Sequence, residues 1–281
     1  MINILFWNTR LGLEKHKTEE RIGAINDKII EIILEDDIDV AIFAEYELDL
    51  QGLCNKLYLV KRNFKIALLS DNTRVKMIYS SRFVVEPIRD SKYYFINLIK
   101  STSIKFLISG VHLQSNMKSG NSEREVVAGQ FMLALNEAQE ETDNKKCVIT
   151  GDFNANPFED VMLKVNCFNS LPYADLVEKK RKRGAFETDY QMFYNPMWNF
   201  LGDLKIPNST YHYDSGGAID FYKNIYDQVI VSAEIVDKLD KKKVKIITET
   251  STGKLLGKNE SPDKQKYSDH LPIIFSIKED I

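Results

Sequence analysis

Eight polar side chains able to bind a cation or move a proton stand where short apolar runs of the sequence end or begin. They are Asn8, Glu45, His112, Asp152, Asn154, Asp220, Asp269 and His270. Strand ends that face one way bring such groups together from distant positions in a chain. The set is rich in hard oxygen ligands and contains no cysteine, so it suits Mg²⁺ or Mn²⁺ better than a closed Zn²⁺ site.

Each of these residues also has a simpler interpretation when it is taken alone. Asp152 and Asn154 could form an Asx turn that closes a strand, and Asp269 could be a loop acid on the surface. Glu45 is different, because a glutamate at the end of an apolar strand is rarely buried without a partner. The recurrence of one arrangement at several strand ends favours a catalytic centre over a series of turns.

The elements that must position these groups follow from hydrophobic periodicity. A helix is predicted from Thr18, because isoleucines recur at three- and four-residue spacing as far as Ile33, and further helices are predicted from about Ser122 and over 158–165. Strands are predicted over residues 4–7, 38–44, 65–70, 75–80, 83–88, 93–99, 104–113, 147–150, 218–222, 226–236, 244–250 and 271–277. A strand–helix–strand opening followed by hairpin-like strands predicts one α/β domain over 1–281 with mixed sheets.

Residues 166–218 form the least regular stretch, and we interpret them as an insertion in this domain. A basic run at 179–183 includes Arg181 and Arg183, which could grip a phosphate backbone, and Trp198 lies in an aromatic segment that could stack on bases. Tyr211 and His212 could also touch a substrate. Charge runs are commonly solvated and aromatic segments commonly pack under loops, so both interpretations stay open.

Six short segments in a fixed order carry most of the polar residues named above. They are Phe6-Trp7-Asn8, Phe43-Ala44-Glu45, Ser109-Gly110-Val111-His112-Leu113, Gly151-Asp152-Phe153-Asn154-Ala155-Asn156-Pro157, the weaker Ala218-Ile219-Asp220-Phe221, and Ser268-Asp269-His270-Leu271-Pro272. Together they resemble the endonuclease/exonuclease/phosphatase superfamily, the group of pancreatic deoxyribonuclease, abasic-site endonucleases, inositol-polyphosphate phosphatases and sphingomyelinases. One such tetrapeptide can occur by chance, whereas the ordered set spans the chain.

The resemblance implies a fold and a role for each residue. The fold would be a four-layer α/β/β/α sandwich, in which two mixed sheets are flanked by helices. Glu45 would be the principal metal carboxylate, with Asn8 and Asp269 as direct or water-mediated ligands. His270 would contact the scissile phosphate and act in acid/base chemistry, with Asp220 holding its other ring nitrogen.

The resemblance also assigns the remaining polar groups. His112 would contact a non-bridging phosphate oxygen, Asp152 would orient or deprotonate the attacking water, and Asn154 would bind a phosphoryl oxygen. In the secreted deoxyribonuclease branch a glutamate on a middle strand pairs with the histidine that corresponds to His112. The 74–79 region offers no such carboxylate, so Arg74 is expected to contribute a phosphate contact instead.

Composition and charge limit the class of protein and its compartment. The chain has 281 residues, 43% of them hydrophobic and 28% charged, and a net charge of −3, which is ordinary for a folded globular protein. No apolar run is long enough to span a membrane, and the N-terminus does not resemble a signal peptide. Three widely spaced cysteines, Cys54, Cys147 and Cys167, indicate a reducing compartment, so a cytoplasmic address is expected.

The sequence therefore predicts metal-dependent hydrolysis of phosphoester bonds. The leading interpretation is a nuclease that acts on DNA or RNA, with Mg²⁺ or Mn²⁺ as cofactor. One alternative is a phosphatase or phosphodiesterase of a small or lipid-linked phosphoester, and a second is an inactive binding module with the same fold. Because the hydrolysis of phosphate esters is among the slowest uncatalysed reactions, several of the groups above would have to act together.

Overall fold

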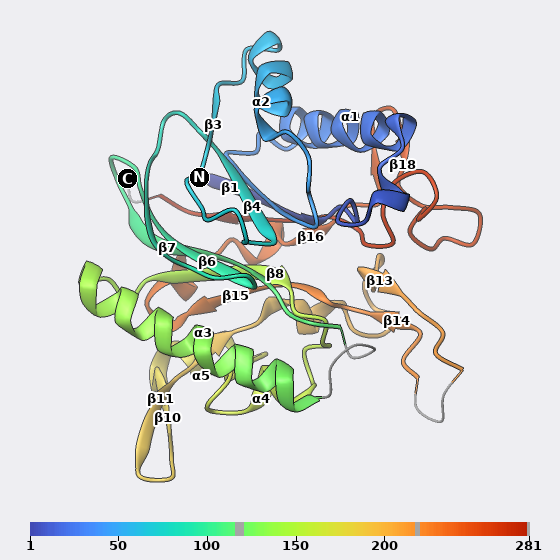
Figure 1. Cartoon of the computed structure of the whole chain (residues 1–281). Helices are drawn as coiled ribbons and strands as arrows, with labels where there is room; N and C mark the ends of the chain where they lie inside the picture. The colour runs from blue at the N-terminus through green and yellow to red at the C-terminus, as the bar shows by residue number, and fades with distance from the viewer. Residues whose placement is uncertain (116–120, 217–219, 280–281) are drawn as a thin grey trace.

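The computed structural model describes residues 1–115, 121–216 and 220–279 (Figure 1). Its first sheet has six strands in the order β16-β19-β1-β2-β4-β3. Their bounds are β16 Lys245–Ile246, β19 Ile273–Ile277, β1 Ile2–Asn8, β2 Val40–Ala44, β4 Val75–Ser80 and β3 Phe64–Ile66. β1 runs parallel to β2 and antiparallel to β19, so the first and last strands of the domain lie side by side.

The second sheet has seven strands in the order β5-β6-β7-β8-β15-β12-β9. Their bounds are β5 Val84–Asp90, β6 Tyr94–Lys100, β7 Lys105–His112, β8 Cys147–Asp152, β15 Asp227–Ser232, β12 Phe193–Tyr194 and β9 Ser170–Leu171. β7 is parallel to β8, and β15 is antiparallel to β8. Both large sheets are therefore mixed, as predicted.

Helices cover the outer faces of both sheets, which gives the four-layer sandwich (Figure 1). α1 Glu19–Glu35 and α2 Leu50–Leu59 lie over the six-stranded sheet, and α3 Asn121–Thr142, α4 Asp160–Leu163 and α5 Ala174–Lys180 belong to the other side. The main apolar core lies between the sheets, where side chains of β1 and β2 meet those of β7, β8 and β15. A smaller core joins α3 and α4 to the seven-stranded sheet.

The predicted helix after Thr18 shows how the sequence fixes these layers. The Thr18 hydroxyl accepts a hydrogen bond from the Arg21 backbone N–H, which caps the first turn of α1. Ile25, Ile29 and Ile32 then present one fully buried stripe toward the sheet. The helix ends at Glu35, just before Asp37 adopts a left-handed backbone.

The described part of the predicted insertion, residues 166–216, is more ordered than predicted. β9 and β12 pair in parallel and extend the seven-stranded sheet at its edge, so part of this stretch belongs to the sheet itself. Between them lie α5 and a protruding hairpin of β10 Lys182–Ala185 and β11 Thr188–Gln191. Strands of two residues are too short to produce a readable alternation, which explains why they were not predicted.

Short elements complete the chain. They are the strands β13 Tyr211–His212, β14 Lys223–Asn224, β17 Glu249–Thr250 and β18 Gly253–Lys254, and the 3₁₀ helices η1 Glu14–His16, η2 Pro196–Phe200, η3 Ala233–Lys238 and η4 Lys241–Lys243. Residues 218 and 219 of the predicted strand 218–222 lie outside the described part of the chain, and residues 220–222 are not in a strand. No described helix is long and apolar enough to cross a membrane.

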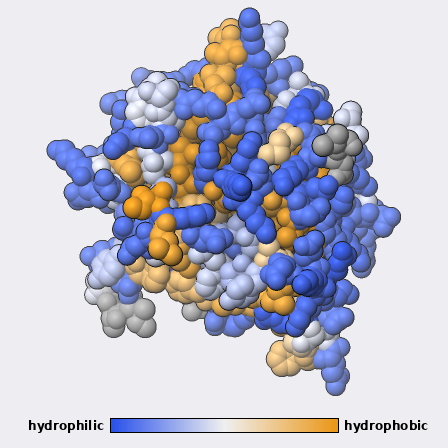
Figure 2. Space-filling model, turned by 180° about the vertical axis from the view of Figure 1, so that it is seen from behind, coloured by the Kyte–Doolittle hydropathy of each residue, from blue (hydrophilic) through white to orange (hydrophobic). Residues whose placement is uncertain are grey.

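Figure 2 shows the rear face, on which hydrophilic residues predominate and apolar side chains gather in small groups. One such group, at the top, lies over the outer end of α2, where Leu59 and Val60 are exposed.

Candidate active site

Strand ends from both sheets meet at one edge of the sandwich. In the six-stranded sheet the last residues of the parallel pair β1 and β2 are Asn8 and Ala44, which lie side by side, and Glu45 follows directly. In the seven-stranded sheet the parallel pair β7 and β8 ends with His112 beside Asp152. The structure therefore gathers these four predicted polar groups as the strand-end argument requires.

A close approach of β7 and β8 depends on a glycine one residue before Asp152. A Cβ atom on Gly151 would lie 2.0 Å from the backbone oxygen of Val111, its neighbour in the pair. No real side chain tolerates that contact. Gly151 in the Gly-Asp-Phe-Asn segment therefore allows the two strands to bring His112 and Asp152 together.

His270 lies between two buried carboxylates. Its Nδ1 is 2.9 Å from Oδ2 of Asp227, and its Nε2 is 3.9 Å from Oδ2 of Asp152. Both aspartates are almost completely inaccessible, at 0% and 1% exposed. Burial lowers the pKa of an imidazolium, but the carboxylates of Asp227, Asp152 and Asp269 outweigh burial and raise the pKa of His270 to about 10. The ring is therefore cationic at neutral pH.

The partner of His270 is Asp227, and the prediction of Asp220 was wrong. The Asp220 carboxylate instead accepts hydrogen bonds from the backbone N–H groups of Ser215 and Tyr222, and so closes its own loop. Asp227 opens β15 opposite Asp152 in the antiparallel pair, which places it under the imidazole. A signal for it was present in the sequence, because it stands two residues before the apolar run Val229-Ile230-Val231.

Asp152 lies at the centre of a hydrogen-bond network. Its Oδ2 accepts from Nδ2 of Asn8 at 2.8 Å, and its Oδ1 accepts from the backbone N–H of Asn154 at 2.9 Å. Burial and Asp227 raise the pKa of Asp152 to about 7, although His270 and the hydrogen bonds from Asn154 and Asn8 act in the opposite direction. A carboxylate with that pKa can exchange a proton near neutral pH.

Asn154 adopts a left-handed backbone with φ 46°. Its side-chain Nδ2 donates to the backbone oxygen of Leu113 at 2.9 Å, which ties the loop after β8 to the end of β7. Arg124 of α3 donates to the Asn154 backbone oxygen and is 3.1 Å from Oε2 of Glu159. The residue is thus held in place at the rim of the site, with one N–H of its amide already used.

Glu45 and Asp269 supply the other carboxylates of the site. Glu45 also has a left-handed backbone, with φ 52°, and its backbone oxygen accepts from Leu11 N–H at 2.8 Å. Burial raises the pKa of its carboxyl group, and Asp269 adds to that shift, while His270, Arg10 and Arg74 oppose it. Asp269 Oδ2 lies 3.2 Å from Nε of Arg10, a partner that the sequence analysis missed.

These two carboxylates and the side-chain oxygen of Asn8 fit a hard divalent cation. Glu45 and Asp269 repel each other, as the pKa of Glu45 shows, and a bound cation would relieve that repulsion. All the donors are oxygens, which Mg²⁺ and Mn²⁺ prefer. The Asn8 oxygen already accepts from the Arg10 backbone N–H at 3.0 Å, so its orientation is fixed.

A second group, Asp152, Asp227 and His270, presents three ligand-type atoms within 4.8 Å of one another. Here both ring nitrogens face carboxylates, and a charged imidazole donates a proton toward each side. A metal would need a neutral ring and would compete with this pairing. We therefore interpret Asp152 and Asp227 as the carboxylates that stabilise the charged form of His270, and not as ligands of a metal.

His112 faces the carboxylates of both neighbouring strand ends. Its Nε2 is 3.6 Å from Oε1 of Glu45 and 3.8 Å from Oδ2 of Asp152. Burial, with Arg74 and His270, lowers the pKa of His112 to about 3, so the ring is neutral where His270 is charged. A neutral imidazole can still donate one hydrogen bond to a phosphate oxygen.

An open cavity of about 440 Å³ lies over these groups. Arg74 and Tyr211 line it, as expected for substrate contacts, together with Arg10, Lys92 and Tyr93, which were not predicted. The Tyr211 ring is 4.6 Å from the His270 ring. A second cavity, of about 600 Å³, shares Asp269 with the first and is lined by His212 and by the loop around residues 256–265.

The other predicted substrate residues are not brought to these cavities. Trp198 packs against Phe158, with ring centroids 6.5 Å apart. Arg181 lies 3.8 Å from Glu234, and Arg183 donates to the backbone oxygen of Leu163 at 3.4 Å. The hairpin that carries the basic run projects at the lower left of Figure 1, whereas β13 lies at the right.

Solved structures share this architecture. Truncated TDP2 from Caenorhabditis elegans is 14% identical with a TM-score of 0.56, covering 98% of this chain and 97% of that chain. An endonuclease/exonuclease/phosphatase family protein from Bacteroides thetaiotaomicron is 14% identical with a TM-score of 0.59, covering 100% and 98%. The human Nocturnin catalytic domain, solved with a bound sulfate anion, is 16% identical with a TM-score of 0.57, covering 99% and 94%.

The fold is therefore that of the endonuclease/exonuclease/phosphatase superfamily, as the ordered motifs predicted. No sequence model of a known family matches the chain, and no curated protein matches it by sequence. The likeness thus lies in the arrangement of the strands and not in extended sequence similarity.

Proposed function

We propose that this protein hydrolyses phosphoester bonds with Mg²⁺ or Mn²⁺, and that its substrate is a phosphodiester of DNA or RNA. The observation that carries the proposal is the chain Asp227–His270–Asp152, which faces the oxygen donors Glu45 and Asp269 across one open cavity. A buried cationic imidazole, a carboxylate near neutral pKa and a hard-cation site are the groups that phosphoester hydrolysis requires.

Glu45, Asp269 and the Asn8 side-chain oxygen would hold the divalent cation. When bound there, the cation would supply positive charge that stabilises the negative charge developing on phosphate oxygens. Arg10 forms an ion pair with Asp269, which holds that carboxylate in the lining of the cavity.

His270 lines the cavity, and it would bind a non-bridging phosphate oxygen there through Nε2. Asp227 holds the ring through Nδ1, which fixes its orientation and favours the charged form. His112 would donate a second hydrogen bond to the phosphate while remaining neutral. The two histidines thus have separate roles because their surroundings push the two pKa values apart.

Asp152 would orient the attacking water and accept its proton. Its Oδ1 is fixed by the Asn154 N–H and its Oδ2 by Asn8, so the carboxylate cannot rotate away from the cavity. Because burial raises the pKa of Asp152 to about 7, the group is a stronger base than an exposed aspartate once it is ionised.

The cations around the cavity support a nucleic acid over a small phosphoester. Arg74, Lys92 and Lys15 line the same cavity as the catalytic groups, and the cavity is open to solvent. A small or lipid-linked phosphoester remains the second candidate, favoured by the limited volume of about 440 Å³ directly over His270. A binding module without activity is disfavoured, since the centre has both its carboxylates and its histidines in place.

We also propose a cytoplasmic location. All three cysteines are buried free thiols, which fits a reducing compartment.

The test offers purified protein a panel of single- and double-stranded DNA, RNA, and small mono- and diesters with Mg²⁺ or Mn²⁺, and repeats each assay with EDTA. Metal-dependent cleavage of an oligonucleotide supports the proposal. Turnover of monoesters alone would exclude a nuclease, and the lack of any metal-dependent turnover would leave the binding module.

A further inference from the structure

The cavity over His270 and the second cavity share Asp269 in their linings, so they are neighbouring parts of one groove, and cations line both parts. We propose that the loop 257–266 is a second phosphate-binding subsite, and that the groove holds a polynucleotide strand by phosphates on either side of the scissile one. This inference rests on the proposed function, because it states how a nucleic-acid substrate would extend through the same site.

The first side of the groove is built from Arg74, Lys92 and Tyr93. The Arg74 guanidinium and the Lys92 ammonium lie 5.7 and 5.6 Å from the centroid of the Tyr93 ring. The Arg74 backbone N–H also donates to the Lys92 backbone oxygen at 3.0 Å, which joins the start of β4 to the turn before β6. Over residues 1–115, 121–216 and 220–279, neither Arg74 nor Lys92 forms an ion pair, so both charges are available to a substrate.

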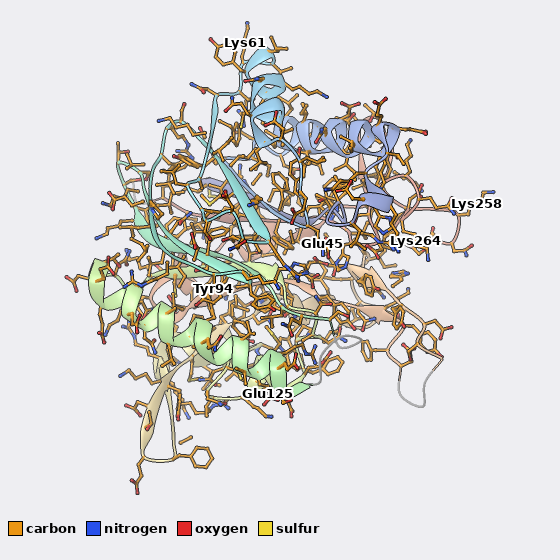
Figure 3. The ribbon with its side chains drawn as sticks, viewed as in Figure 1. Glu45, Lys61, Tyr94, Glu125, Lys258 and Lys264 are labelled. Atoms are coloured by element: carbon orange, nitrogen blue, oxygen red, sulfur yellow. The ribbon has the colours of Figure 1, made fainter. Side chains whose placement is uncertain are left out.

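The second side is built from Lys258, Lys264 and His212, which line the neighbouring cavity. Figure 3 shows Lys264 and Lys258 on the loop to the right of Glu45, with Lys264 the nearer of the two in that view. Both lysines are exposed, and neither forms an ion pair within the described parts of the chain.

The loop that carries these lysines has a fixed backbone. Its ends are tied by the Gly257 N–H to the Ser261 oxygen at 2.8 Å and by the Asp263 N–H to the Leu255 oxygen at 2.9 Å. Asp263, which could have neutralised a lysine, accepts from the backbone N–H groups of Gln265 and Lys266 at 3.2 and 3.1 Å. The loop therefore presents its ammonium groups on a formed support, and Asp263 stabilises the turn while it also lines the cavity.

The negative charge at the centre of the groove explains why a strand needs the cations on both sides. Glu45, Asp152 and Asp269 make the centre of the groove negative, which repels an anionic substrate that touches only the centre. Phosphates seated on Arg74 and Lys92 and on Lys258 and Lys264 would offset that repulsion. Each cavity, of about 440 and 600 Å³, has room for one small ligand, so the joined groove fits a substrate longer than one nucleotide.

The test compares the wild-type protein with the double variant Lys258→Gln/Lys264→Gln and with Lys61→Gln. Lys61 is an exposed lysine at the outer end of α2, away from the groove (Figure 3), and serves as the matched control. Binding of fluorescein-labelled 12-nucleotide DNA and RNA strands is measured by anisotropy in EDTA over a range of salt concentrations. Cleavage of the same strands and of a dinucleotide is measured with Mg²⁺.

We expect the double variant to bind the 12-nucleotide strands about 5- to 30-fold more weakly at low salt. The slope of log Kd against log salt should fall by about 1.4, since each contact on a single strand contributes about 0.7. The advantage of the 12-nucleotide strand over the dinucleotide in kcat/KM should shrink by a similar factor, and Lys61→Gln should change neither quantity.

If the double variant has the same affinity and the same salt slope as Lys61→Gln, the proposed subsite is wrong, even if the strand is cleaved. Conversely, binding that depends on the two lysines without hydrolysis of any phosphoester would overturn the proposed function and retain the subsite as a binding surface.

Discussion

The replacement Asp227→Asn tests the central pair of the site. It keeps the size of the side chain and an oxygen that can accept from His270 Nδ1, but removes a buried negative charge 2.9 Å from the ring. The His270 pKa of about 10 exceeds the ordinary value of 6.5, and a difference of 3.5 corresponds to about 5 kcal/mol. Asp227 is the largest favourable contributor, ahead of Asp152 and Asp269.

Loss of one close opposite charge changes a pKa by about 1 to 3, so we expect the pKa of His270 to fall by about 2. The rate should fall by about 10³- to 10⁴-fold, as for the orienting aspartate of a serine-hydrolase triad. A raised histidine pKa stabilises the folded state fully below pH 6.5, and this stabilisation is lost as the pH rises through about 10. The variant should therefore lose up to about 3 kcal/mol of unfolding free energy at pH 7, and the deficit should narrow toward pH 10.

Three measurements check this expectation. Cleavage kinetics give the loss in rate, the histidine resonances in an NMR titration give the pKa of His270, and urea denaturation at several pH values gives the stability. The matched control is Asp220→Asn, which removes a carboxylate that accepts hydrogen bonds from the backbone of Ser215 and Tyr222, and it should leave the rate within about twofold. A fully active Asp227→Asn with an unchanged His270 titration, or an Asp220→Asn variant that is equally damaged, would refute the reasoning.

Three further outcomes follow from the structure. Glu45→Gln should raise the Mg²⁺ concentration needed for half-maximal cleavage at least about 10-fold, and a metal titration that overlays the wild type would remove Glu45 from the cation site. Gly151→Ala should cost about 3 kcal/mol of stability in urea denaturation, because its Cβ would meet the Val111 oxygen at 2.0 Å; an unchanged midpoint would contradict that packing. Neutralising residues 179–183 should leave the salt slope of strand binding unchanged, whereas a slope reduced by several contacts would return that hairpin to the binding surface.

The fold could be predicted because its strand ends carry residues that packing does not explain. Glu45 after an apolar run and Asp152 after another needed no structural knowledge to be noticed. α2 was not predicted, although Leu50, Leu53 and Leu57 stand at helical spacing and Asp49 caps the first turn through the backbone N–H of Gly52. Helical periodicity is therefore present in this segment as well.

The carboxylate that pairs with Nδ1 of His270 could not be predicted in the same way. Asp220 and Asp227 lie seven positions apart, each beside apolar residues, and local pattern alone does not decide which of them faces His270. The decision comes from the antiparallel pairing of Asp227 with Asp152, a contact between strands far apart in the chain. Arg10 was missed for the same reason, since its ion pair with Asp269 spans almost the whole domain.

The net charge of −3 is a poor guide to the partners of this protein, because the charges are sorted in space. Carboxylates concentrate at the centre of the groove, where a divalent cation would offset them. Arg74 and Lys92 stand on one side and Lys258 and Lys264 on the other, and none of the four forms an ion pair among the residues that the structure describes. A small phosphoester meets mainly the centre, whereas a strand also reaches the two sides. The local field, rather than the total charge, therefore favours an extended anionic substrate, and it does so without the basic run at 179–183 that first suggested one.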